Sequence, residues 1–240
     1  MNNTIVNNLF DFWKHIGFLT GRLIVTKEYT AVSMHGSDWP NRIFDIETNP
    51  LLIEEVSHLS KANQLPDMIT ISNPDDFIDR DDFEFRFAQR NMALDMNLLA
   101  EDEIINTNIT RVETETDAIN FANTASNAFG YKVDADVVSI IATQSDNSKL
   151  FIYKEGDECL GCGIVYFDAN NNAGLHMIGT VDKGRGKGIG KSMTEWLLCV
   201  ARQNKSPYCV LNASVMGEPI YTKLGFRSYG DLRNYQIIED

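Results

Sequence analysis

The apolar and polar positions between residues 109 and 238 form a regular succession of strand and helix patterns. Short apolar or alternating stretches predict strands, and apolar residues three or four positions apart predict helices. The clearest helix runs from about Gly190 to Gln203, where Ile189, Met193 and Leu197 share one stripe. The predicted order is β-α-α-β-β-β-α-β-α-β. Strands are predicted at 109–112, 149–154, 160–166, 175–181, 208–211 and, as one or two strands, within 227–238, with a short helix at 218–225.

Capping residues predict where the two helices after the strand at 109–112 begin and where the first of them ends. Thr116 or Asp117 is expected to cap the first helix, which ends at Gly130. Asp134 or Asp136 is expected to start the second.

Residues 1–105 carry a less regular pattern. Helices are predicted at 9–18, broken by Gly17 and Gly21, and at 50–64, and strands at 29–34, 42–46, 68–71 and, as one or two strands, within 83–96. The polar stretch 101–108 lacks periodicity and predicts a linker. We therefore expect two domains, a smaller α/β domain at 1–105 and a larger one at 106–240.

A glycine-rich stretch joins a predicted strand to the clearest helix. Gly184, Gly186, Gly188 and Gly190 alternate there with Arg185, Lys187 and Ile189. Unpaired backbone N–H groups and the positive end of a helix dipole bind anions, above all phosphates. The stretch therefore predicts a phosphate cradle, with a flexible loop that binds nothing as the alternative.

Spacing separates the known phosphate cradles. A P-loop would use Gly190, Lys191 and Ser192, but Arg185 stands where its first glycine is required. A dinucleotide fingerprint needs an odd offset between two glycines, and all four glycines have even numbers. Neither pattern is met in full.

Composition narrows the class of protein. The chain has 240 residues, 43% of them hydrophobic, and a formal net charge of -13. This charge argues against nucleic-acid binding. An acidic body with a local basic patch in the glycine-rich stretch suits an anionic cofactor and, more weakly, a cationic substrate. No apolar run is long enough for a membrane span, and the first residues lack the order of a signal peptide, so we expect a cytoplasmic protein.

The four cysteines do not form a metal-binding pattern. Cys159 and Cys162 have ligand spacing, but Cys199 and Cys209 are not a second such pair and no histidine joins them. We expect ordinary core or strand residues and no metal site.

Two short motifs carry a resemblance to a known family. Arg185, Gly188 and Gly190 match the pyrophosphate loop of the GNAT superfamily of N-acetyltransferases, and Tyr221 to Phe226 resembles the end of its fourth helix. The resemblance covers residues 109–238. It implies an α/β (α+β) fold with a mixed, mostly antiparallel sheet and helices on both faces. Residues 1–105 are then a degenerate GNAT-like half or a substrate or dimerisation module.

The resemblance also implies site residues. Acetyl-CoA would be the co-substrate, and Tyr221 would protonate the leaving thiolate, unless it is only a packed aromatic residue. A backbone N–H at Ile178, Gly179 or Thr180 would face the oxyanion, with Gly179 marking a strand bulge. The diphosphate would be held by Lys183 and by the stretch Arg185, Gly186, Lys187, Gly188, Ile189, Gly190 and Lys191.

Two positions on the substrate side match the pattern of the family less closely. His176 lies nine residues before Arg185, where a family member carries a histidine in its proton path, so it is the candidate general base. A strand histidine that only packs is the alternative. Ser214 stands where the family often has an asparagine that binds the pantetheine arm, with Asn212 two residues earlier.

These motifs predict an N-acetyltransferase that moves an acetyl group from acetyl-CoA to a primary amine of a small molecule or peptide. A non-catalytic acyl-CoA sensor on the same fold and a nucleotide-phosphate binder are the alternatives. The acidic run 75–84 is either a solvated face or a collar that attracts the amine. No nucleic-acid or membrane partner is expected, and a homodimer is an open possibility.

Overall fold

The computed structural model describes residues 1–73, 77, 80–99 and 106–238. Most of the predicted linker and part of the acidic run therefore lie outside the described residues. The helices are α1 (Asn2–Leu19), α2 (Pro50–Lys61), α3 (Glu115–Phe129), α4 (Ala135–Gln144), α5 (Ile189–Gln203) and α6 (Glu218–Lys223). The strands are β1 (Leu23–Val25), β2 (Thr30–Val32), β3 (Arg42–Phe44), β4 (Met68–Ile71), β5 (Phe83–Asp95), β6 (Ile109–Arg111), β7 (Ser148–Glu155), β8 (Glu158–Phe167), β9 (Ala173–Thr180), β10 (Tyr208–Ala213) and β11 (Arg227–Ile237).

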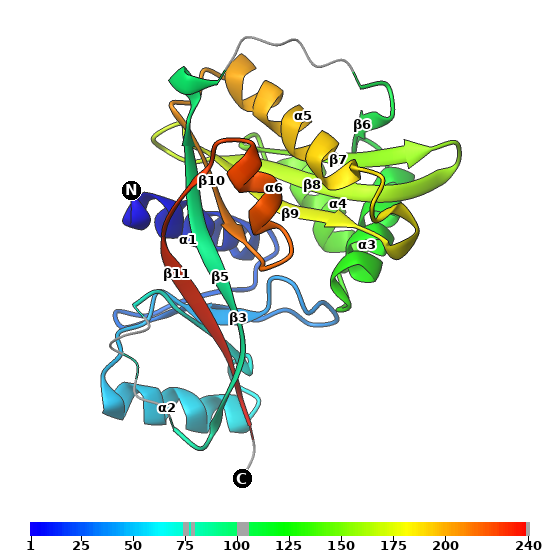
Figure 1. The fold of residues 1–240 in the computed structure, drawn as a ribbon. Coiled ribbons are helices and arrows are strands. Elements are labelled where there is room, and N and C mark those ends of the chain that lie inside the picture. The colour runs from blue at the N-terminus through cyan, green and yellow to red at the C-terminus, as the bar shows by residue number, and fades with distance from the viewer. Residues whose placement is uncertain (74–76, 78–79, 100–105, 239–240) are drawn as a thin grey trace.

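The described strands form one eleven-stranded sheet in the order β1-β2-β3-β4-β11-β5-β10-β9-β8-β7-β6 (Figure 1). Neighbours are antiparallel except for the pairs β3–β4 and β9–β10. This is the mixed, mostly antiparallel sheet expected from the sequence, and the fold class is confirmed.

The middle of the sheet combines strands from both halves of the chain. The last strand, β11, lies between β4 and β5, and β5 pairs on its other side with β10. Paired strands thus connect the first half of the chain to the second. The domain boundary at residue 105 stays a prediction.

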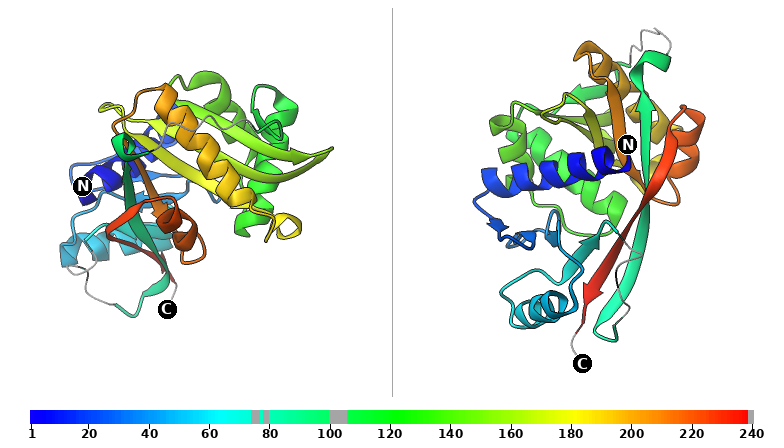
Figure 2. Two further views of the ribbon diagram at one scale, coloured as in Figure 1. Left: turned by 45° about the horizontal axis from the view of Figure 1, so that its top comes forward. Right: turned by 90° about the vertical axis from the view of Figure 1, so that its left-hand side faces the viewer.

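Helices cover both faces of the sheet. Alternate residues of β7 point to opposite faces, as they must in a strand: Leu150 and Ile152 pack with α1, α3 and α4, whereas Phe151 and Tyr153 pack with α5. The two layers are visible on either side of the sheet (Figure 2). The helix α2 packs its buried Ile53 and Val56 with residues of the outer strands.

The N-terminal helix differs from its prediction. It begins at Asn2 and continues through Gly17, so the predicted break at that glycine is wrong. Gly17 is buried, and a Cβ atom there would lie 2.8 Å from a methyl group of Val32. The glycine is needed for close packing of helix on strand. The three-residue strand β1 follows and has no prediction, because so short a strand leaves little periodic signal.

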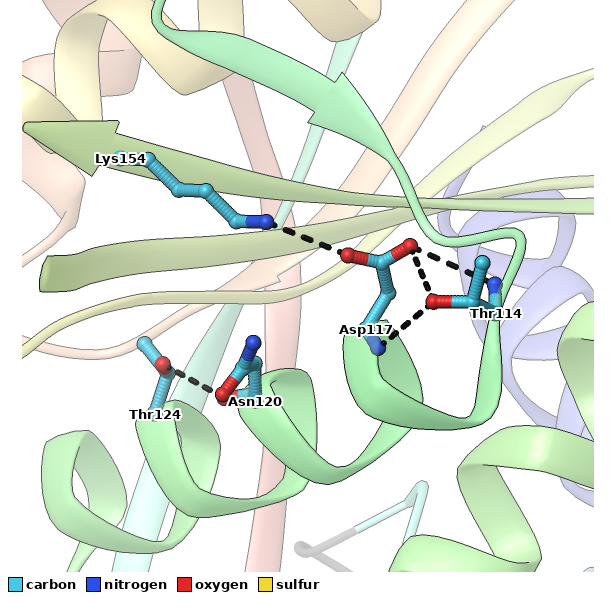
Figure 3. A network of polar contacts seen from close by, with 5 residues as sticks. All are labelled: Thr114, Asp117, Asn120, Thr124 and Lys154. Carbon is cyan, nitrogen blue, oxygen red and sulfur yellow. Dashed lines mark hydrogen bonds and ion pairs between the residues drawn. The ribbon is translucent and has the colours of Figure 1, made fainter. Parts of the chain in front are cut away.

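The helix α3 begins two residues earlier than predicted. Thr114 is the N-cap: its hydroxyl accepts from Asp117 N–H at 3.1 Å, and Asp117 Oδ2 accepts from Thr114 N–H at 3.3 Å (Figure 3). Lys154 Nζ lies 3.2 Å from Asp117 Oδ1, which ties the cap to β7. Within the helix, the Thr124 hydroxyl donates to Asn120 O at 2.7 Å. The cap thus falls on the threonine with the aspartate three residues after it, the spacing of a capping box.

The cap gives a stability prediction. Thr114→Ala removes the hydroxyl that satisfies a free amide of the first turn, so we expect the free energy of unfolding to fall by about 1 kcal/mol. Thr116→Ala is the matched control, because that exposed side chain lies inside the helix and makes no cap. Urea-induced unfolding of both variants measures the difference. An equal loss in both would contradict the assignment.

Candidate active site

The strands β9 and β10 are parallel neighbours that pair over a short stretch only. Cys209 pairs with Ala173 and Val210 with Gly174, and beyond these positions no pairing continues. A cavity of about 260 Å³ lies beside the separated ends. Its described lining residues are Leu9, Phe12, Trp13, Trp39, Arg42, Phe87, Gln89, Phe129, Tyr131, Leu175, His176, Met177, Ile178, Leu211, Asn212, Ser214 and Tyr221.

A bulge in β9 lies next to this gap. Cys162 of β8 pairs with Gly179 and Ile164 pairs with His176, so Met177 and Ile178 together face one residue of β8. Met177 has a φ of 50°, and its carbonyl oxygen accepts from the Cys162 thiol at 3.3 Å. The bulge expected at Gly179 thus lies two residues earlier, because the backbone turns at Met177. The extra residue bends the strand away from a straight course.

The three residues predicted to face an oxyanion are placed differently. Ile178 belongs to the bulge and lines the cavity. Gly179 and Thr180 pair with β8.

Tyr221 closes the cavity from α6. Its ring is 9% exposed and packs edge-on against Phe226, with ring centres 5.9 Å apart. Its hydroxyl makes no hydrogen bond to a described residue. Burial raises the pKa of Tyr221 to about 12, so the phenol keeps its proton at neutral pH.

His176 enters the cavity from β9 and is held by α1. Its ring stacks on Phe12 at 4.5 Å, and its Nε2 lies 3.2 Å from Asn8 Oδ1. Asn8 Nδ2 donates to Asp168 Oδ2 at 3.0 Å, which directs the amide oxygen toward the histidine. Nε2 therefore carries the hydrogen and Nδ1 the lone pair. Burial lowers the pKa of His176 to about 3, so the ring is neutral.

Gly174 makes room for this contact. A Cβ atom on Gly174 would lie 1.9 Å from Asn8 Oδ1 and 2.4 Å from His176 Nε2. Any side chain at this position would displace the bond between α1 and β9.

The glycine-rich stretch forms a loop that ends in the first turn of α5. Gly186 and Gly188 have φ values of 78° and 79°, which favour glycine, and Gly188 is the N-cap. The first-turn amides of Ile189, Gly190 and Lys191 have no partner within the helix. The Lys187 amide is already used, since it donates to Gly184 O at 3.3 Å. The predicted anion cradle therefore consists mainly of the helix start.

The four cations of this loop are paired with carboxylates that are exposed or, for Glu195, half-buried. Lys183 lies 2.9 Å from Glu158, Lys187 lies 2.9 Å from Glu155, and the pairs Arg185–Asp182 and Lys191–Glu195 measure 2.7 and 2.8 Å. Exposed pairs of this kind contribute little, about 0–1 kcal/mol. An arriving diphosphate can replace these carboxylates at small cost.

Two polar residues lie at the end of β10. Ser214 accepts at its Oγ from Gly217 N–H at 3.2 Å, which shapes the turn into α6. Asn212 donates from Nδ2 to Asn91 Oδ1 at 2.6 Å, but its buried Oδ1 has no partner. Both line the cavity.

The first half of the chain contributes residues that have no sequence motif. Asn8, Phe12 and Trp13 come from α1 and Arg42 from β3, and the last three line the cavity. The residues of α1 are indicated in the sequence only by the apolar and aromatic helix pattern, and Arg42 is indicated by nothing. Their convergence on the site follows from the sheet order and from the contacts of α1 with β9 and β10.

Other site classes leave no trace in the described part of the chain. No cluster of three or more His, Cys, Asp or Glu with metal-binding geometry occurs there. None of its helices is long and apolar enough to cross a membrane. A larger hollow of about 580 Å³ beside β1 and β3 contains none of the predicted site residues.

The parted strands β9 and β10 and the bulge lie beside one cavity, and the glycine-rich loop follows β9 and leads into α5. The chain belongs to the GNAT acetyltransferase family. The family model of the acetyltransferase (GNAT) domain matches residues 102–238, which are more than half of this chain.

Solved structures show the same fold over nearly the whole chain. A GCN5-related N-acetyltransferase from Kribbella flavida is 13% identical with a TM-score of 0.65, and the match covers 95% of this chain and 94% of that one. A GCN5-related N-acetyltransferase from Sphaerobacter thermophilus is 12% identical with a TM-score of 0.57, covering 82% and 73%. A functionally unknown protein from Staphylococcus epidermidis is 11% identical with a TM-score of 0.59, covering 90% and 93%. No curated protein matches the chain.

Proposed function

We propose that this protein transfers an acetyl group from acetyl-CoA to a primary amine of a small molecule or peptide. One observation carries the proposal: a single cavity, at the point where β9 and β10 part, is lined by both Tyr221 and His176. The first is a protonated donor and the second a neutral acceptor, as acyl transfer to an amine requires.

The helix start fits the diphosphate of the co-substrate. Acetyl-CoA supplies the acetyl group as a thioester. The amides of Ile189, Gly190 and Lys191 and the basic side chains beside them would hold the diphosphate. The Ile178 amide, in the bulge, is the proposed donor to the oxygen that gains negative charge.

The two side chains divide the proton transfers. Tyr221 donates its phenol proton to the leaving sulfur. His176 accepts a hydrogen bond from the amine at Nδ1, because Nε2 is held by Asn8. Charging a ring with a pKa of about 3 is costly, so the amine must attack in its neutral form. We therefore propose that His176 orients the amine, whereas the general-base role expected from the sequence stays a prediction.

Binding of coenzyme A is the first test. We expect the chain to bind coenzyme A in isothermal titration calorimetry and to show no comparable response to ATP. Gly190→Ala should weaken this binding by about tenfold or more, a loss of about 1.4 kcal/mol, because the methyl group would lie at the amides that face the diphosphate. Its folding should survive, since a Cβ there meets neighbours only at 3.6 Å. Unchanged affinity in this variant would contradict the proposed cradle.

Tyr221→Phe tests the acid. We expect kcat to fall by about 100-fold, with little change in thermal stability, because the hydroxyl donates to no described residue. Tyr229→Phe, a change on an exposed ring of β11, is the matched control. Release of the coenzyme A thiol measures turnover. Full activity in Tyr221→Phe would remove the acid role, and binding without turnover in the native chain would favour an acyl-CoA sensor.

The pH profile tests the proton assignments. A raised pKa keeps Tyr221 protonated up to about 12, and a lowered pKa keeps His176 neutral above about 3, so neither titrates between pH 5 and 10. We expect kcat/KM to rise with pH along the titration of the acceptor amine and to show no fall below about pH 11. With two amines of different pKa, the midpoint should move with the amine. A fixed midpoint near ~6.5 would instead indicate a titrating histidine.

A further inference from the structure

Arg42 is a buried cation in the wall of the proposed acceptor cavity. It is the first residue of β3 and is 8% exposed. Its guanidinium stacks over the Trp13 ring, 4.5 Å from the ring centre. Nη1 donates to Asn234 Oδ1 at 3.2 Å and weakly to Thr70 Oγ1 at 3.4 Å. The side chain is therefore held firmly in one position.

The positive charge of Arg42 is not balanced by a carboxylate of the described residues. No described carboxylate lies within ion-pair distance of the guanidinium, and its Nε is buried without a hydrogen-bond partner. Burial lowers the pKa of Arg42 from its ordinary value, but that value is too high for the group to become neutral near pH 7. Buried charges are normally paired, because removing a charge from water is costly. A binding partner with negative charge would remove this cost.

The rest of the cavity wall points to the same kind of ligand. None of its described lining residues is Asp or Glu, so no carboxylate there would pair with an ammonium group. This differs from the cationic substrate suggested by the net charge of -13. Most of the remaining wall is apolar and aromatic, and it includes the rings of Phe12, Trp39, Phe87 and Tyr131. A dicationic or polyamine acceptor therefore fits poorly.

We propose that the acceptor is an amine that also carries a carboxylate, bound by Arg42, together with an apolar or aromatic body, as in a free hydrophobic amino acid. This inference rests on the proposed N-acetyltransferase function and adds the substrate class. Arg42 binds the carboxylate through its guanidinium N–H groups, because paired N–H donors match the two oxygens of a carboxylate. The aromatic wall holds the body.

The reaction at the bound acceptor is an ordinary acyl transfer. The neutral amine nitrogen forms a bond to the acetyl carbon, and the carbon–sulfur bond breaks with its electron pair going to sulfur. Tyr221 protonates that sulfur, and the proton lost from nitrogen returns to the solvent or to the phenolate. Asn212 lines the same cavity, and its buried Oδ1 has no partner among the described residues, so we assign this oxygen as an acceptor for an amine N–H. Arg42 takes no part in the bond changes and is a binding residue.

Paired acceptors test the proposal on the full chain. Phenylalanine and phenethylamine differ only by the carboxylate, as do leucine and 3-methylbutylamine. We expect kcat/KM to be about 10- to 100-fold higher for the amino acid of each pair when compared at equal fractions of neutral amine. In Arg42→Met the preference should disappear through a rise in KM for the amino acid, with phenethylamine little changed. Arg42→Lys should keep part of the preference, because it keeps the charge but not the paired N–H groups.

Two further measurements keep the result interpretable. Arg227→Met, a change at an exposed arginine, is the control for loss of a positive charge. Thermal unfolding and coenzyme A binding show that each variant folds. Calorimetry of 3-phenylpropanoate with the chain loaded with coenzyme A tests the carboxylate contact without turnover. We expect binding in the native chain and about tenfold weaker binding or more in Arg42→Met.

The outcomes separate this inference from the proposed function. Equal or better turnover of the simple amines would overturn the assignment of Arg42 while leaving the acetyltransferase proposal intact. Coenzyme A binding without turnover of any of the four amines would count against the enzyme, and 3-phenylpropanoate binding would still decide the role of Arg42. No binding of this carboxylate to the native chain would overturn the inference.

Discussion

The separation of β9 from β10 is the constraint on which the site depends. Both strands are in the centre of the sheet, where each would ordinarily be paired along its whole length, yet they share pairs only at Cys209 and Val210. The bulge at Met177 turns β9 away, and β10 is held instead by its antiparallel pairing with β5. Backbone groups that would otherwise be used in the sheet thereby face a cavity. A ligand with an extended, amide-containing arm can pair with such groups as an added strand does.

The N-terminal half supplies part of the wall of the cavity beside this gap. The helix α1 crosses beneath β9 and β10 and supplies Phe12 and Trp13 to the wall, while β3 supplies Arg42. The bond from His176 to Asn8 links the two halves at the site itself, and it exists only because Gly174 has no side chain. The acceptor side of the pocket is therefore a product of long-range packing. Changes in α1 far from any motif will alter the chemistry of His176, since its tautomer is set there.

Local signals explain what could be predicted from the sequence. The stripe on α5 and the alternating glycines belong to one continuous segment, so spacing alone was enough to predict the helix and its anion loop. Turn chemistry was less decisive: Thr114 and Thr116 are both possible caps, and only the aspartate three residues later distinguishes them. Arg42 could not have been found, because a single arginine in a short strand carries no periodic or motif signal. Its importance comes from burial beside Trp13, a contact across the fold.

The cations of the glycine-rich loop and Arg42 differ in their exposure to water and in their partners. The lysines and Arg185 of the loop are exposed and already paired with carboxylates such as Glu158, so another anion can replace these carboxylates at a small free-energy cost. Their main effect is to attract an anion to the loop. Arg42 is desolvated and lacks a carboxylate in the described structure, so its interaction with an anion is stronger and depends on exact geometry. The loop therefore suits a ligand that must arrive and leave on every cycle. The buried arginine suits selection, because a wrong acceptor leaves its charge unpaired.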